Sequence, residues 1–231
     1  MKLITVPAVL LVLAAPGSRG QIQDDLTLGV EAVTGVRSDY VYRGFQLADA
    51  VMDFQLEGEI ALGGDFYLDL GGWFASETGG DFSETAGFAD LRRALSERFT
   101  AGGVLGYHSY HRSLFDSGLD LGAYLTFFPA ENWSVTAEAS RDFGAAGWWA
   151  NAETGWSRRL TDHAFLTIRG GLSAVDGYYG RSGFNDLHGR ASLTCNLNRM
   201  VSLTPFVGGS VELLDGDGNE WFGGLWFEVS F

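Results

Sequence analysis

The sequence predicts an all-β chain that folds as a single-chain transmembrane antiparallel up-and-down β-barrel of twelve strands. Apolar and polar residues alternate in twelve segments, which is the period of a strand with two different faces. Most of these segments have about 9 to 12 residues, the length that a tilted strand needs to cross a bilayer. Short connections alternate with longer ones, and the number of strands is even, as in bacterial single-chain outer-membrane barrels.

A secretory signal peptide is predicted for residues 1–20. Lys2 is followed by an apolar run, residues 3–15, and by small residues that suit cleavage after Gly17 or Gly20. The run is too short to cross a bilayer as a helix, and no later apolar run approaches the roughly 18 residues that a membrane helix needs. Residues 21–231 are expected to form one outer-membrane β-barrel domain.

The composition argues against nucleic-acid binding and favours strands. Asp and Glu number 29 against 15 Lys and Arg, so the formal net charge is −14 and phosphates would be repelled. The chain has 33 Gly, 17 Phe, 8 Tyr and 7 Trp, and a closed barrel of strands satisfies every backbone polar group in lipid. The single cysteine, Cys195, cannot form an internal disulfide, and we interpret it as a small apolar side chain.

The alternation is clearest in residues 51–62, where Met52, Phe54 and Leu56 alternate with Asp53 and Glu57. A strand places such acids on one face, whereas a helix would distribute them around its circumference. In chain order, the predicted strands are residues 27–42, 51–62, 66–75, 88–96, 99–109, 119–127, 133–142, 148–157, 164–174, 187–197, 201–213 and 221–231. The pattern is weaker in the first, fourth, fifth and eighth of them.

The connections predict how the barrel is oriented. With the N-terminus in the periplasm, the periplasmic turns are short, and they are residues 63–65, 97–98, 128–132, 158–163 and 198–199. The loops at the other end are longer, and they include residues 77–87, 110–118, 175–186 and 214–220. Short periplasmic turns and longer extracellular loops are typical of outer-membrane barrels.

The last strand carries apolar residues at every second position, including Trp221, Phe227 and the terminal Phe231. Exposed chain ends are usually poorly ordered, so we expect this strand to close the barrel beside the first one, with these side chains facing lipid. The pattern also resembles the insertion signal of outer-membrane proteins. The expected partners are therefore the barrel insertion machinery, outer-membrane lipid and lipopolysaccharide. A soluble periplasmic barrel or sandwich is the alternative, and it would have to bury these apolar faces in one core.

A short motif near the start of the barrel resembles a known family. The motif is formed by Ser38, Asp39, Tyr40, Tyr42, Arg43 and Gly44, and a second, looser block contains Phe66, Tyr67, Trp73 and Ser76. Both are similar to motifs of the TorF-type family of bacterial outer-membrane proteins, although residues 45–49 differ from the family's usual continuation. The resemblance covers about the first third of the chain. It implies an outer-membrane barrel and gives no substrate.

The motif also has a physical interpretation. Asp39 and Arg43 share a strand face but lie about 13 Å apart along the strand, so they cannot pair with each other. We expect each to meet a neighbouring strand across the lumen, and we expect Gly44 to allow a tight turn at the outer edge. Binding of a solute by these residues is the alternative.

The strand faces opposite the apolar ones predict the lining of the lumen. Its expected members are Asp53, Glu57, Glu59, Asp69, Asp120, Glu138, Glu153, Arg169, Arg190 and Glu228, with Arg92 or Arg93 undecided. Charged side chains are tolerated there because the interior of such a barrel is polar. Bulky residues on the same faces, among them Trp73, Tyr124 and Trp149, should narrow the passage. The sequence therefore predicts an acidic, constricted lumen that prefers cations.

Two further stretches of the sequence contain residues that could carry chemistry. His108, Ser109, His111 and Ser113 lie at the outer end of the fifth strand and could belong to an acyl hydrolase, but no third group that would orient a histidine is evident. Residues 215–219 begin like a calcium loop but lack the required Gly and Glu, so a hairpin turn is favoured. Neither a cofactor nor a metal is expected.

The predicted function is a narrow channel for small solutes in the outer membrane of a Gram-negative bacterium, without enzymatic activity. A structural or adhesive barrel with an occluded lumen is the main alternative, followed by an outer-membrane acyl hydrolase.

Overall fold

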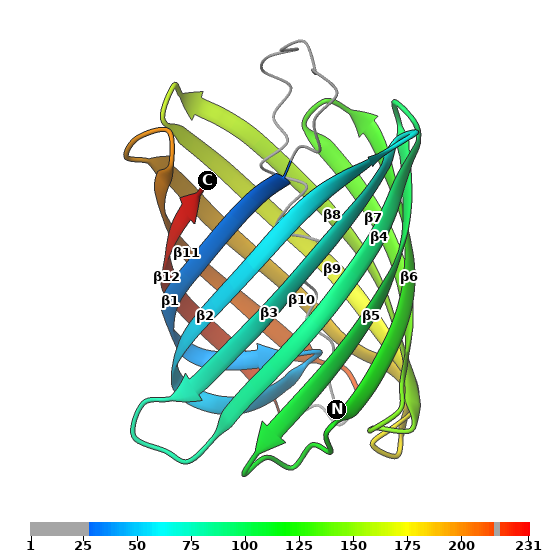
Figure 1. Cartoon of the computed structure of the whole chain (residues 1–231). Helices are drawn as coiled ribbons and strands as arrows, with labels where there is room; N and C mark the ends of the chain where they lie inside the picture. Colours follow the sequence, from blue (N-terminus) through cyan, green and yellow to red (C-terminus); the bar gives the residue numbers. More distant parts are fainter. Residues whose placement is uncertain (1–27, 215–217) are drawn as a thin grey trace.

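Twelve antiparallel strands close into one up-and-down barrel in the computed structural model, which describes residues 28–214 and 218–231 (Figure 1). The predicted fold class and the number of strands are confirmed. The predicted signal peptide lies outside the described residues. The strands are β1 (Leu28–Tyr42), β2 (Phe45–Gly63), β3 (Phe66–Glu77), β4 (Ser83–Ser96), β5 (Phe99–His111), β6 (Gly118–Ala130), β7 (Trp133–Asp142), β8 (Gly147–Thr161), β9 (Ala164–Tyr178), β10 (Arg181–Asn196), β11 (Val201–Glu212) and β12 (Asn219–Ser230).

Each strand pairs with its neighbours in sequence, and β1 pairs with β12 to complete the ring. This closing pair runs from Glu31 opposite Ser230 to Arg37 opposite Gly224. The terminal residue takes part, because the Phe231 backbone nitrogen donates a hydrogen bond to the Val30 carbonyl oxygen at 2.8 Å. The chain therefore ends inside a hydrogen-bonded ladder, which removes the sheet edge that a free end would leave.

The two rims of the barrel differ in their connections. Turns at the upper rim of Figure 1 are short, as between β2 and β3, where only residues 64–65 lie outside the strands. The predicted long loops at the lower rim are shorter than expected, because the strands continue into them. Residues 175–186 reduce to a turn at residues 179–180, and residues 77–87 reduce to residues 78–82.

Backbone irregularities explain why these strand ends were missed. β2 begins at Phe45 and not at residue 51, and Ala50 adopts a positive φ of 40° inside it, which interrupts the alternation. In β10 the register against β9 shifts twice, between Arg181 and Gly183 and between Phe184 and Asp186. A shift of one residue exchanges the two faces of a strand, so the alternation is lost in sequence while the pairing continues.

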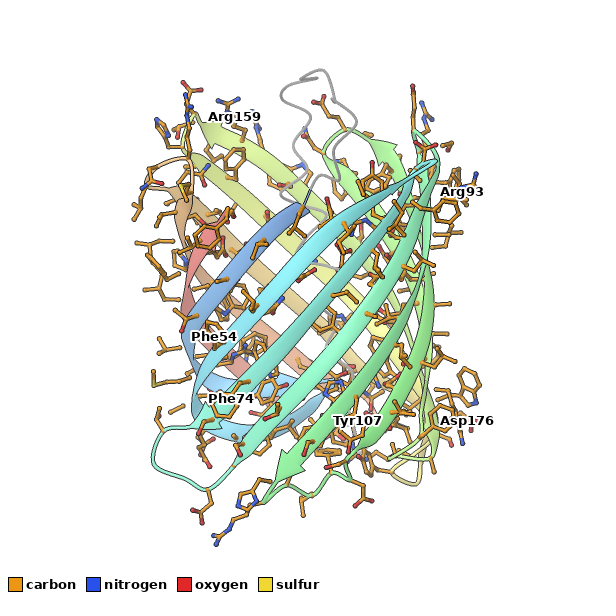
Figure 2. The ribbon with its side chains drawn as sticks, viewed as in Figure 1. Phe54, Phe74, Arg93, Tyr107, Arg159 and Asp176 are labelled. Atoms are coloured by element: carbon orange, nitrogen blue, oxygen red, sulfur yellow. The ribbon has the colours of Figure 1, made fainter. Side chains whose placement is uncertain are left out.

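Apolar side chains cover the outside of the barrel. Figure 2 shows Phe54, Phe74 and Tyr107 pointing away from it, while Arg93 and Arg159 lie near the upper rim and Asp176 near the lower one. Large hydrophobic side chains that are exposed on all sides of the ring include Leu70, Leu91, Leu105, Leu121, Leu125, Ile168, Val207 and Phe227. No helix among the described residues is long and apolar enough to cross a membrane.

Candidate functional site

The inner faces of the strands form the candidate site, and the predicted lumen residues lie on them. Six of these residues are buried, namely Asp53, Glu57, Asp69, Asp120, Arg169 and Glu228. Glu59, Glu138, Glu153 and Arg190 are partly buried. The three residues predicted for the outer face of the last strand, Trp221, Phe227 and Phe231, are exposed. Burial of ionised groups is tolerated only where they are paired or hydrogen-bonded, so their partners define the site.

Acidic residues and two arginines line the wall formed by β1 to β4. The Arg92 guanidinium pairs with both Asp69 on β3 and Glu59 on β2. Arg37 on β1 pairs with Asp53 on β2. The undecided choice between Arg92 and Arg93 is thereby settled, because Arg93 is exposed and its guanidinium lies 4.8 Å from the outward-facing Phe66 ring. These pairs join neighbouring strands and fix side chains against the wall.

A second acidic group lies in the upper half of the barrel, on β1, β2 and β12. Glu31 on β1 stands directly opposite Glu57 on β2. Glu228 on β12 stands opposite Val33, which is two residues after Glu31 on the same face of β1. The Ser202 hydroxyl donates to Glu228 at 2.6 Å. Like charges directly opposite each other on paired strands repel, so water or counter-ions at this end of the lumen would be favourable.

The hairpin between β1 and β2 bends into the barrel at its lower end. Figure 1 shows it lying across the opening, and its turn residue Arg43 contacts strands on the far side of the lumen. In the ring, β1 and β2 are adjacent, whereas β6 and β7 lie four and five places beyond β2. Side chains from the turn can reach those strands only by crossing the interior.

Arg43 holds the hairpin in this position through buried polar contacts. Its guanidinium donates to Asp120 on β6 at 3.1 Å and to Ser140 on β7 at 2.8 Å. It also lies 3.7 Å from Asp142 and 4.3 Å from the centre of the Trp149 ring. The side chains of Arg43, Asp120 and Asp142 are almost fully buried. Charged pairs of this kind are costly to break from one side, because the remaining charge stays buried without its partner.

Gly44 and Asn185 also hold the turn of the hairpin against β10. The Asn185 side-chain amide on β10 donates to the Arg43 carbonyl oxygen at 2.8 Å. Gly44 has a φ of 77°, and a Cβ atom added there would lie 2.8 Å from the Asn185 amide nitrogen and 2.9 Å from the Asp186 Cβ. Both its conformation and its close approach to β10 therefore require glycine. The predicted tight turn at Gly44 is present, but it lies inside the lumen and not at the outer edge.

The expectation for Asp39 is wrong. Arg43 does meet the opposite wall, but the Asp39 carboxylate accepts a hydrogen bond of 3.0 Å from the Gln46 side chain on the adjacent β2, at an exposed position. The register between β1 and β2 shifts between Tyr40 and Val41, so the even spacing of Asp39 and Arg43 no longer places them on one face.

Aromatic side chains fill the space beside the hairpin. One cluster contains Tyr40, Tyr42, Val51, Trp73, Phe82, Val104 and Tyr124, and a second contains Ala145, Trp149, Val175 and Tyr178 with Phe45 packed against it. Phe45, which follows the Arg43 turn, also makes an edge contact with Phe115 in the loop between β5 and β6, with ring centroids 5.4 Å apart. These side chains occupy the lower end of the lumen, and the narrow passage expected from inward-facing aromatic residues stays a prediction.

The wall that faces the acidic one, here the basic wall, carries Arg169, His188 and Arg190, together with the carboxylates of Glu153 and Asp186. Arg169 on β9 and Arg190 on β10 stand directly opposite each other in the ladder. In the ring of strands, β9 lies six places from β3, so the basic wall and the Asp69 wall are diametrically opposed. A cavity of about 180 Å³ lies between the basic wall and the hairpin, and Arg43, Trp149 and His188 are among its lining residues. The two arginines that the alternation predicts for the lining, Arg169 and Arg190, therefore lie together on one wall, opposite the wall of Asp53, Glu57, Glu59 and Asp69.

The residues considered for an acyl hydrolase are not brought together as a catalytic group. His108 is buried, and its Nδ1 lies 2.7 Å from the Glu84 carboxylate, which also accepts a hydrogen bond from Tyr40. Ser109 is exposed on the opposite face of β5. The Ser113 hydroxyl accepts a hydrogen bond from the Phe115 backbone nitrogen at 3.1 Å, in the exposed loop after β5. No hydrogen bond joins these serines to His108 or His111 in the described part of the chain.

Three partners of the hairpin were missed by sequence reasoning. Ser140, Tyr178 and Asn185 come from β7, β9 and β10 and meet only at the Arg43 turn. Ser140 has the inward parity of its strand, which is a usable signal. Asn185 carries no such signal, because the register shift beside it hides which face it occupies. The hairpin turn favoured over a calcium loop for residues 215–219 falls largely on residues 215–217, which lie outside the described residues.

Comparisons with known proteins identify structural relatives only. No protein-family model matches the sequence, and no curated protein matches it. The fold is similar to that of the NanC porin, with a TM-score of 0.57, 10% identity, and coverage of 87% of this chain and 98% of that one. The KdgM porin in complex with disordered oligogalacturonate gives a TM-score of 0.56 and 11% identity, and covers 88% of this chain and 99% of its own.

A third solved structure, the COG4313 outer membrane channel from Pseudomonas putida F1, matches with a TM-score of 0.54 and 14% identity. The match covers 94% of this chain and 99% of that one. At such low identities these similarities establish the fold. The resemblance to the TorF-type family remains a prediction from the motif.

Proposed function

We propose that the chain is a narrow channel for small solutes in the outer membrane of a Gram-negative bacterium. The observation that carries this proposal is the contrast between the two faces of the barrel. The outer face carries exposed Phe, Leu and Ile side chains, and the inner face carries the charged pairs of Arg37, Arg43 and Arg92. Lipid is the medium that makes such an outer face favourable, whereas charges are tolerated inside because the interior is wet.

The structural neighbours support a channel. Two of them are described as porins and one as an outer membrane channel, and each is matched over 87% or more of this chain. The Arg43 hairpin and the aromatic clusters beside it would make this channel narrower than an open cylinder of twelve strands. The short connections at the upper rim fit a periplasmic location for that rim, and the hairpin then faces the outside of the cell.

The lumen should prefer cations over anions. Inward-facing carboxylates outnumber inward-facing arginines, and the group of Glu31, Glu57 and Glu228 lies at the upper end without an arginine bound to it among the described residues. A field set up by fixed negative charges raises the local concentration of cations. This preference is part of the proposal and is measured together with conduction.

Single-channel recording in planar bilayers tests the proposal. The purified full-length barrel should give discrete current steps, and in a salt gradient of potassium chloride the zero-current potential should have the sign of a cation-preferring pore. Steps that prefer chloride would overturn the acidic selectivity while leaving a channel. Complete absence of current would contradict the channel and favour a barrel with an occluded lumen. The buried salt bridges of Arg43 would then explain the occlusion.

A further inference from the structure

Arg190 differs from the other inward-facing arginines of the barrel in its surroundings. Arg37, Arg43 and Arg92 each pair with carboxylates. The Arg190 guanidinium instead lies 4.9 Å from the centre of the Trp226 ring and 5.9 Å from that of Phe206, and it makes no salt bridge with a residue that the structure describes. A positive charge held over aromatic rings inside a protein is stabilised by them only in part, so a carboxylate beside it would be favourable.

Arg169 places a second positive charge beside Arg190, which makes a negative charge between them more favourable. Arg169 stands directly opposite Arg190 in the ladder between β9 and β10, where like charges repel. Its nearest carboxylate oxygen belongs to Glu153, at 3.5 Å. The second Glu153 oxygen lies 4.0 Å from His188, so this single carboxylate is shared between two basic groups. Glu153 is therefore shared between Arg169 and His188, and it forms no salt bridge with Arg190 among the described residues.

The other acid of the cavity is already engaged. Asp186 accepts hydrogen bonds from the Ser173 and Ser210 hydroxyls and from the Asn185 amide, and His188 lies 3.0 Å from it. These contacts occupy both of its oxygens. Asp186 thus orients His188, and it forms no salt bridge with Arg190 among the described residues.

Two uncharged polar atoms in the same cavity also lack partners. The Trp149 indole nitrogen and the Asn151 carbonyl oxygen are buried, and neither makes a hydrogen bond to any residue of the described ranges. Both residues line the cavity of about 180 Å³, together with Arg169 and Arg190. Buried polar groups are normally hydrogen-bonded, so one donor and one acceptor are available in addition to the positive charge.

We propose that this cavity is a binding site for a small carboxylate that also carries hydroxyl groups. The carboxylate would be held by Arg190 and Arg169, whose planar guanidinium groups match its geometry. A hydroxyl of the solute would donate to the Asn151 oxygen, and another oxygen would accept from the Trp149 indole nitrogen. This inference rests on the proposed function, because it names a solute that would bind inside the channel. The site is a local group of positive charges beside the Arg43 hairpin, and binding there is separate from the preference of the whole lumen for cations.

Binding can be measured without any current. Isothermal titration calorimetry with the full barrel folded in detergent micelles, titrated with sodium gluconate, should show saturable binding. Glucitol has the same hydroxylated chain without the carboxylate and should show none. Sulfate should bind more weakly than gluconate. If glucitol binds as well as gluconate, or sulfate binds as tightly, the site does not recognise a hydroxylated carboxylate.

Three variants test the residues. Arg190→Gln should weaken gluconate binding by about tenfold, the loss of one charge-assisted pair. Glu153→Gln removes the acid that competes for Arg169, so it should strengthen binding, an effect opposite in sign and thus not explained by misfolding. Arg159→Gln, at an exposed position near the upper rim, is the matched control and should leave binding unchanged.

If Arg190→Gln binds gluconate as tightly as the unmodified protein, and circular dichroism shows that both are folded, the proposed site is wrong. Weaker binding by Glu153→Gln would also show this. Because calorimetry needs no membrane, gluconate binding without single-channel current would contradict the channel and leave the site, and current without binding would do the reverse.

Discussion

Replacing Arg43 by alanine is expected to raise the single-channel conductance several-fold. The guanidinium is the group that joins the β1–β2 hairpin to Asp120, Ser140 and Asp142 on the far wall. Without it, both carboxylates would stay buried without a cation, which costs roughly 3 to 5 kcal/mol for a broken buried pair. Release of the hairpin from the lumen lets water reach these acids, so the open arrangement becomes favourable. Recording in planar bilayers at one salt concentration measures the change.

Arg92→Ala is the control for this experiment. It removes the same charge from the lumen, but Arg92 pairs with Glu59 and Asp69 on neighbouring strands of the wall and holds no hairpin. Its conductance should change little compared with that of the Arg43 variant. Equal conductances of Arg43→Ala and the unmodified protein would show that the hairpin does not limit the current.

Arginine in place of Leu105 is expected to destabilise the barrel in a bilayer by about 2 to 4 kcal/mol, the cost of a cation on the lipid face at mid-depth. Leu105 lies at the middle of β5 and is 50% exposed on the outer face. The cost arises because the guanidinium would have to leave water for hydrocarbon. Urea unfolding of the barrel in lipid vesicles measures the free energy of unfolding.

Leu114 provides the comparison, because it is 97% exposed and lies in the loop between β5 and β6. Leu114→Arg should change the free energy of unfolding very little, since the new charge remains in water. A Leu105→Arg barrel as stable as the Leu114→Arg barrel would mean that water and not lipid covers the outer face.

Much of the fold could be predicted from the period of the side chains. β7 begins at Trp133 and ends at Asp142, as the alternation predicts, because the register shift in its ladder with β6 falls within residues 127–130 of β6 and leaves the alternation of β7 intact. Prediction failed where the backbone departs from regular pairing. Ala50 hides the first part of β2, and the register shifts near Phe184 hide the start of β10. Such irregularities preserve the hydrogen bonds between the strands, but they exchange the inner and outer faces of the strand that contains them. The alternation in the sequence is therefore interrupted at these points.

The residues that line the lumen could be predicted by the same reasoning, but the contacts between their side chains could not. The parity of Asp53, Asp69 and Arg169 identifies the inner face of each strand. The contacts of Arg43 depend on which strands face each other across the ring and on the bend of one hairpin. Asp120 and Asn185 are 77 and 142 residues away from it in sequence, and no local pattern connects them. The placement of Arg169 on the wall opposite Asp69 follows from the same closure.

Fluorescence quenching by brominated lipids would show directly whether hydrocarbon surrounds the barrel. Trp148 and Trp149 are adjacent in sequence and face opposite sides of β8, with 50% and 3% of their surfaces exposed. In vesicles whose acyl chains are brominated near the headgroup, Trp148→Phe should lose part of the quenching seen in the unmodified protein, and Trp149→Phe should lose none. Quenching that is unchanged by Trp148→Phe, together with quenching of Trp148 by aqueous iodide, would place water on the outer face and contradict a membrane-spanning barrel.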